Sequence, residues 1–156
     1  MKGRQIIILT WYLTNDKNVL QDSDRMDLMY KCGRQGNGDI NGFRQMMRKF
    51  GAKAVINATW PGGTWKCLHH AANFGHIDII TLLVENGADL DPKALSDETP
   101  LRMAIKRRKY ASITTLIKLG ASLEKAKESD YEQSEFDARM RDVNTKLAIA
   151  GQRKKD

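Results

Sequence analysis

The sequence predicts an all-α repeat solenoid of about three helix-turn-helix units with short hairpin loops, followed by a C-terminal helix. Two segments of the 156-residue chain align with each other at one constant spacing. Within each segment, and again near the C-terminus, apolar residues recur at helical intervals. Aromatic residues make up only 7% of the chain, which favours helices packed through Leu, Ile, Met and Ala over a β-sandwich.

The spacing between the two segments is the same at two independent landmarks. The interval from Leu68 to Leu101 equals the interval from Gly87 to Gly120, and both give a 33-residue period. Both glycines begin a short motif, Gly-Ala-Asp-Leu in the first segment and Gly-Ala-Ser-Leu in the second. A period of roughly 20–50 residues is typical of solenoids, in which each unit covers the apolar face of its neighbour.

Local sequence features predict two short helices in each unit. Thr99 is a good N-cap, and Pro100 suits the first helical position, where no backbone N–H is needed. Gly75 and His76 interrupt the first helix of the earlier unit, and Gly87 supplies the left-handed residue that ends its second helix. The apolar face of that second helix is formed by Ile79, Ile80, Leu83 and Val84.

Short motifs follow one another in a fixed order along the better-defined unit. They are Leu-His-His-Ala-Ala from Leu68, Gly-His from Gly75, Leu-Leu from Leu82 and Gly-Ala-Asp from Gly87. Together with the period, they resemble the ankyrin repeat, closely over residues 64–91 and less closely over residues 97–123. The resemblance implies an ankyrin-repeat solenoid in which His69 and His76 are structural hydrogen-bonding residues.

Both units depart from the family pattern in places. Lys66 and Cys67 stand where Thr-Pro is usual, so we expect a weaker start to that helix. In the second unit Arg102 replaces the usual histidine, and Arg108-Lys109 replaces Gly-His.

An earlier, degenerate unit is predicted before these two. Gly51-Ala52 resembles the pair that closes a repeat, and a Gly-rich turn longer than the family uses runs from Gly33 to Gly38. The segment 53–64 is also longer than expected. The apolar positions of this unit are Leu28 and Cys32 in its first half and Phe43, Met46 and Met47 in its second. A third unit is physically reasonable because about three are needed for a stable solenoid.

A single helix is predicted over residues 131–150, ended by Gly151. Its apolar stripe consists of Phe136, Met140, Val143, Leu147 and Ala150. The stripe has two interpretations, a cap that covers the last repeat and a coiled-coil seam for a partner helix; we favour the cap.

The N-terminal segment is less informative. Residues 5–13 predict either a short strand or a capping helix, and Asp22, Asp24 and Asp27 favour the N-terminal turn of a helix. The predicted organisation is an N-terminal extension or cap over 1–23, a repeat domain over 24–124 with units of approximately 24–58, 62–94 and 95–126, and a C-terminal helix and basic tail over 127–156.

The formal net charge of +7 is unevenly distributed. Residues 1–62 carry ten basic and five acidic side chains, hence +5, whereas residues 124–142 carry four and seven, hence −3. This balance indicates an acidic protein face, a nucleic acid or an anionic membrane as partner, or solubility alone. The cluster Lys106-Arg107-Arg108-Lys109 has three interpretations: a docking patch, a solvated helix end or a nuclear localisation signal.

Catalytic and cofactor motifs are not found. The chain contains no phosphate loop, no dinucleotide-binding glycine motif and no nucleophile elbow. Cys67, His69 and His70 are close in sequence, but adjacent residues on a helix diverge by about 100°, so neither a metal site nor a Cys–His pair is expected. We interpret Cys32 and Cys67 as small buried apolar residues. No catalytic, cofactor-binding or metal-binding residue is therefore predicted.

The location predicted is intracellular. Two cysteines do not make a disulfide framework, and no apolar stretch approaches the roughly 20 residues that span a bilayer. We expect a cytoplasmic protein without membrane insertion, with cytoskeletal or nuclear association as further options.

The resemblance implies that a partner contacts the variable positions of the face built from hairpin tips and first helices. In this sequence those positions are Trp65, Asn73, Phe74, Lys93, Ser96, Glu98, Lys106 and Arg107. Trp65 and Phe74, flanked by basic groups, have the composition of an interface hot spot. In the alternative interpretation, Trp65 packs on Trp60 and Pro61.

The function predicted is a non-catalytic protein–protein interaction module, as a small structural or adaptor subunit of a larger intracellular assembly. Its partner is expected to present an acidic surface, for example a tubulin-like polymer or an assembly subunit. Nucleic-acid association is the second hypothesis and a thiol or metal enzyme the third.

Overall fold

The computed structural model describes residues 19–34, 38–127 and 133–152. Helices dominate this part of the chain, and a π-helical turn, η1, directly continues the first of them. The α-helices are α2 (Asp22–Met29), α3 (Ile40–Phe50), α4 (Ala52–Asn57), α5 (Cys67–Phe74), α6 (Ile77–Glu85), α7 (Pro100–Lys106), α8 (Tyr110–Leu119), α9 (Leu123–Lys127) and α10 (Gln133–Gln152). Two short segments complete them, η1 (Tyr30–Arg34) and the 3₁₀ turn η2 (Leu95–Asp97).

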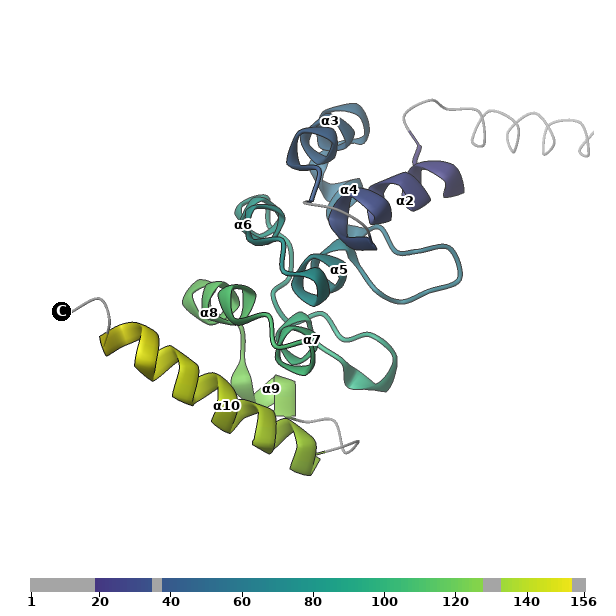
Figure 1. Cartoon of the computed structure of the whole chain (residues 1–156). Coiled ribbons are helices and arrows are strands. Elements are labelled where there is room, and N and C mark those ends of the chain that lie inside the picture. The colour runs from purple at the N-terminus through teal and green to yellow at the C-terminus, as the bar shows by residue number, and fades with distance from the viewer. Residues whose placement is uncertain (1–18, 35–37, 128–132, 153–156) are drawn as a thin grey trace, which may run out of the picture.

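The helices stack as pairs in two rows (Figure 1). The first-helix row consists of α2 with η1, then α5, then α7, and the second-helix row consists of α3, α6 and α8. Two long loops leave the first-helix row, one before α5 and one before α7, and α10 packs against α7 at the end of the stack. The predicted all-α solenoid of three helix-turn-helix units with a C-terminal helix is confirmed.

The core runs through the units without interruption. Leu28, Cys32 and Phe43 are all 0% exposed, as the degenerate first unit predicts. The later units contribute side chains exposed by no more than 2%, among them Leu68, Ile80, Leu83, Leu101, Ile113 and Leu116. Complete burial of such a side chain stabilises the fold by about 1.5–3 kcal/mol, so packing between units, rather than the intrinsic stability of these short helices, holds the stack together.

The helix ends follow the predicted chemistry. Thr99 caps α7 because its hydroxyl accepts a hydrogen bond from the Arg102 N–H at 3.2 Å. Gly75 ends α5 with a φ of 94°, and Gly87 follows α6 with a φ of 85°. Lys66, which lacks a capping hydroxyl, donates its backbone N–H to the ring of His69 at 3.1 Å. That bond compensates in part for the missing Thr-Pro.

Two boundary predictions are wrong. Gly33 lies in the π-helical turn rather than in a loop. A glycine is needed at this position because a Cβ would come within 2.8 Å of the Phe74 ring and 2.9 Å of the His70 Cβ. The glycine permits close packing of η1 on α5. At the other end, α10 continues through Gly151 to Gln152, because glycine disfavours a helix by only about 1 kcal/mol.

The C-terminal helix is held on the last repeat by its apolar stripe and by a polar cluster. Phe136 and Val143 are buried, and Arg102 of α7 lies over the Phe136 ring at 5.1 Å. Tyr110 of α8 donates its hydroxyl to Asp142 at 2.5 Å and accepts a bond from Lys146 at 2.8 Å. These contacts favour the capping interpretation of the stripe over a seam left open for a partner helix.

Several predictions lie outside the described residues or stay predictions. Residues 5–13 and the basic tail Arg153-Lys154-Lys155 belong to the undescribed ends. The domain boundaries stay a prediction. In the described residues, none of the helices combines the length and the apolar character needed to cross a bilayer.

Candidate functional site

A hollow of about 410 Å³ gathers five of the eight predicted site residues. They are Trp65, Asn73, Glu98, Lys106 and Arg107, and the lining is completed by Met103, Glu135 and Arg139. The hollow is bordered by the loops before α5 and α7, the C-terminal ends of those helices, and the first turns of α10. We refer to it as the α7 hollow.

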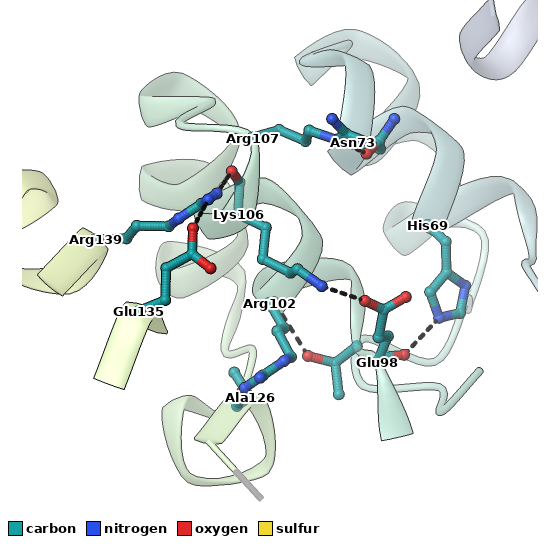
Figure 2. A network of polar contacts seen from close by, with 10 residues as sticks. His69, Asn73, Glu98, Arg102, Lys106, Arg107, Ala126, Glu135 and Arg139 are labelled. Carbon is teal, nitrogen blue, oxygen red and sulfur yellow. Dashed lines mark hydrogen bonds and ion pairs between the residues drawn. The ribbon is translucent and has the colours of Figure 1, made fainter. Parts of the chain in front are cut away.

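The loop on one side of the hollow is held by a buried histidine. His69 is 0% exposed, and its Nε2 lies 3.0 Å from the Pro92 carbonyl oxygen and 3.1 Å from that of Glu98. Its Nδ1 accepts the Lys66 N–H, so the ring is neutral with its proton on Nε2. Burial lowers the pKa of His69, which favours this neutral form. His69 therefore fixes the backbone of Glu98 against α5 (Figure 2).

Two side-chain pairs join the elements around the hollow (Figure 2). Lys106 of α7 donates to the Glu98 carboxylate at 2.8 Å, so the loop is tied to the helix. Arg107, the residue that ends α7, donates its Nε to the side-chain oxygen of Asn73 at 3.0 Å. Since Asn73 lies at the end of α5, this bond links the C-terminal ends of two neighbouring first helices at the hollow.

The C-terminal helix supplies the remaining wall. Arg139 donates to the backbone carbonyl of Lys106 and to the Glu135 carboxylate, one turn earlier on α10 (Figure 2). The Lys106 carbonyl is among the last four of α7, which have no partner within their own helix. Arg139 thus caps α7 and brings α10 to the hollow. The i,i+4 pair of Glu135 and Arg139 is visible in the sequence, but its position beside α7 is not.

The α7 hollow is lined by both charged and apolar side chains, and hydrogen bonds within the protein already hold its polar groups. Lys106, Arg107 and Arg139 carry positive charge and Glu98 and Glu135 negative charge, which leaves +1. The half-buried Trp65 and the buried Met103 add apolar surface. The lining includes no Cys, His or Ser. Fixed donors and acceptors beside an aromatic ring suit binding of a polypeptide surface.

The other predicted site residues lie away from the hollow. Phe74 is 37% exposed and stacks on His76, with 6.4 Å between ring centroids. Lys93 pairs with Asp97 across the loop at 3.6 Å. Ser96 is in η2, and its side chain is outside the described part. The structure does not bring these three to the lining of the hollow.

The two tryptophans beside the loop before α5 have different aromatic partners. The Trp65 ring meets His70 edge-on, with 5.3 Å between centroids. Trp60, in contrast, packs on Tyr30 at 6.4 Å. The alternative interpretation, in which Trp65 packs on Trp60 and Pro61, stays a prediction.

The cysteine and histidines near the start of α5 do not converge. The buried Cys67 donates its thiol to the Val55 carbonyl at 3.4 Å, whereas His69 faces the loop before α7. Burial lowers the pKa of His70 to about 4. His76, expected to be a structural hydrogen-bonding residue, makes no ring hydrogen bond to the described residues, since its ring lies against Phe74 and the backbone of Gly38. Within the described ranges, no three acidic, Cys or His side chains are grouped to hold a metal.

Arg102 performs in the next unit the task of His69. It is 2% exposed, and its guanidinium donates to the Ala126 carbonyl at 2.9 Å (Figure 2). The bond reaches from α7 to α9, as the His69 ring reaches from α5 to the loop before α7. The departure from the family pattern therefore replaces a shorter tether by a longer one.

Comparisons with known proteins agree with this architecture. A family model described as ankyrin repeats, in three copies, matches residues 28–127, which is more than half of the chain. A 42-residue stretch is 48% identical to the NF-kappa-B inhibitor cactus of Drosophila yakuba and to that of Drosophila melanogaster. The match covers 26% of this chain but only 9% and 8% of the two relatives, so the chain spans a small part of their length.

Proposed function

Since the chain belongs to the ankyrin-repeat family, we propose that it is a non-catalytic structural or adaptor subunit whose protein partner docks in the α7 hollow. Ankyrin repeats are protein–protein interaction modules. The similarity to the cactus proteins is limited to 42 residues and supports binding in general rather than a particular partner.

The observation that carries the proposal is the convergence of three structural parts on one hollow. Loop residues, the ends of α5 and α7, and the start of α10 all contribute to it. Their polar side chains are already held by hydrogen bonds, as those of Lys106 and Arg107 show. A partner that docks there has less side-chain entropy to remove, and Trp65 supplies an aromatic anchor.

The partner that suits this hollow presents a carboxylate beside an apolar group. Arg107 uses Nε for Asn73 and is exposed, so its two terminal nitrogens remain able to donate to a carboxylate. The net charge of +7 favours an acidic partner at longer range. An acidic polymer such as tubulin, or a subunit of an intracellular assembly, has this chemistry, and the free thiols Cys32 and Cys67 accord with a cytoplasmic location.

A pull-down with the tagged full chain tests the proposal. We expect Trp65→Ala/Arg107→Glu to weaken capture of a stoichiometric protein by about 2 kcal/mol, or roughly 30-fold. The matched variant Phe74→Ala/Lys93→Glu changes the same kinds of residue outside the hollow and should keep the partner. Quantitative mass spectrometry of the captured proteins, at low and moderate salt, gives the comparison.

The opposite outcomes are equally specific. Capture that survives Trp65→Ala/Arg107→Glu would place the binding surface elsewhere and refute docking in the hollow. Recovery of nucleic acid in place of protein, abolished by nuclease and by moderate salt, would support the second hypothesis, because phosphate contacts weaken steeply with salt.

A further inference from the structure

A second hollow, of about 390 Å³, opens between α3 and α6 in the second-helix row. Its floor is apolar and consists of Met47, Ala52 and Leu82. Its rim is polar and consists of Arg44 and Arg48 on α3 and of Glu85 and Asn86 at the end of α6. This α3–α6 groove shares no lining residue with the α7 hollow.

The two arginines of the rim have no ion-pair partner among the described residues. Both are exposed, and they lie one turn apart on α3. Carboxylates of the same part of the chain pair with lysines instead: Asp24 with Lys49 at 3.6 Å, Asp27 with Lys31 at 2.8 Å and Asp39 with Lys31 at 3.6 Å. The groove therefore combines exposed positive charge with an apolar floor.

We propose that the α3–α6 groove binds an acidic amphipathic helix of a partner protein. The apolar stripe of that helix covers Met47 and Leu82, and two of its carboxylates, one turn apart, pair with Arg44 and Arg48. Cβ atoms at i and i+4 are about 5–6 Å apart on either helix, so the charges match when the helices run side by side. Guanidinium groups accept such carboxylates in a two-bond fork.

The composition of the groove selects a helix over a nucleic acid. An apolar floor gains free energy when it is covered by apolar side chains, which a phosphate backbone does not supply. Glu85 on the opposite rim repels a uniformly anionic polymer, whereas it tolerates a helix whose acidic residues lie along one edge. The inference goes beyond the proposed function, because it assigns a separate surface to a partner of defined chemistry.

The test is selection from a phage-displayed library of random peptides of about 16 residues, roughly four helical turns, on the immobilised full chain. We expect enriched sequences with two acidic residues one turn apart beside an apolar stripe. Their affinity, measured by fluorescence anisotropy of labelled synthetic peptides, should fall about tenfold or more in Arg44→Glu/Arg48→Glu. Arg44→Gln/Arg48→Gln provides a neutral second variant, with a smaller loss.

The control variant Lys118→Glu/Arg141→Glu makes the same change in net charge at exposed positions outside the groove. It should leave the affinity unchanged. Enrichment of non-acidic peptides would overturn the proposal. A loss of peptide affinity in the control variant as large as that in Arg44→Glu/Arg48→Glu would also overturn it. Tighter binding of a duplex oligonucleotide that is lost in Arg44→Glu/Arg48→Glu would also overturn it.

The result of this test can be distinguished from the result of the test of the proposed function. Peptides of the α3–α6 groove should bind Trp65→Ala/Arg107→Glu as they bind the wild type. If this variant abolishes their binding, the peptides occupy the α7 hollow and the groove proposal is wrong. Loss of the natural partner in that same variant, with peptide binding intact, would support both proposals, docking in the α7 hollow and helix binding in the α3–α6 groove.

Discussion

Successive repeats place different residues at the turn that follows their first helix. Gly75 follows α5 with a φ of 94°, and Arg108, at the equivalent position of the next repeat, follows α7 with a φ of 54°. A left-handed backbone costs a residue with a Cβ about 1–2 kcal/mol, and glycine is free of that cost. Arg108 is therefore a strained position in the turn between α7 and α8.

Replacement of Arg108 by glycine should stabilise the protein. The relief of strain exceeds the added entropy of the unfolded chain, so we expect a gain of roughly 0.5–1 kcal/mol in the free energy of unfolding. Urea titration followed by circular dichroism measures it. Arg108→Ala removes the guanidinium but keeps the Cβ, and it should give no such gain; equal effects of the two changes would contradict the role assigned to the backbone.

Stability should fall as the pH is lowered from about 6.5 to about 4. Burial lowers the pKa of His70 to about 4 and lowers that of His69 as well. The unfolded chain, with histidine pKa values near 6.5, therefore binds protons that the folded chain does not. The contribution of the neutral rings is complete above the unfolded pKa and is lost as the pH falls toward the folded one.

Urea titrations between neutral pH and pH 4.5 measure this dependence. The variant His70→Gln should flatten the curve, because it removes the ring whose pKa burial lowers to about 4. A free energy of unfolding that rises as the pH falls would contradict the burial of these neutral rings.

Among the elements, α10 connects the last repeat to the α7 hollow. Its apolar side packs on α7, and its Glu135 and Arg139 reach the α7 hollow. Tyr110 holds the middle of the helix through Asp142 and Lys146. The hydrogen bond from Tyr110 is the main cause of the lowered pKa of Asp142.

Tyr110→Phe should loosen α10 without unfolding the stack. The change removes one hydroxyl from the surface of α8 and leaves the ring in place, so the buried Phe136 and Val143 keep their packing. Hydrogen exchange measured by mass spectrometry should show faster exchange in peptides of α10 and unchanged exchange in α5 and α6. Uniform acceleration across all helices would show that α10 is not a separable cap.

At the scale of the whole molecule, most of the repeat architecture could be predicted from the sequence. Local physical causes explain three of its features: the glycines with positive φ, the Thr99 cap and the apolar residues at helical spacing. Each of these features can therefore be recognised in the sequence. The constant repeat period then places Trp65, Lys106 and Arg107 on one side of the stack.

Other features depend on tertiary contacts, and the sequence does not contain them in readable form. A glycine such as Gly33 serves a turn or a close approach of two helices, and only the packing against α5 distinguishes these. The angle at which α10 crosses α7 brings Arg139 to the Lys106 carbonyl, although periodicity indicates only which side is apolar. For the same reason the floor of the α3–α6 groove combines Met47 and Ala52 of the first unit with Leu82 of the second.

The central claim is that a protein partner docks in the α7 hollow, and photo-cross-linking tests it most directly. A benzoylphenylalanine residue in place of Trp65 reports contact at the hollow, and the same residue in place of the exposed Ile117 reports contact at α8, outside both the α7 hollow and the α3–α6 groove. We expect a discrete cross-linked protein from position 65 and none from position 117. Cross-links from position 117 alone, or from neither position while the partner is still captured, would contradict the account.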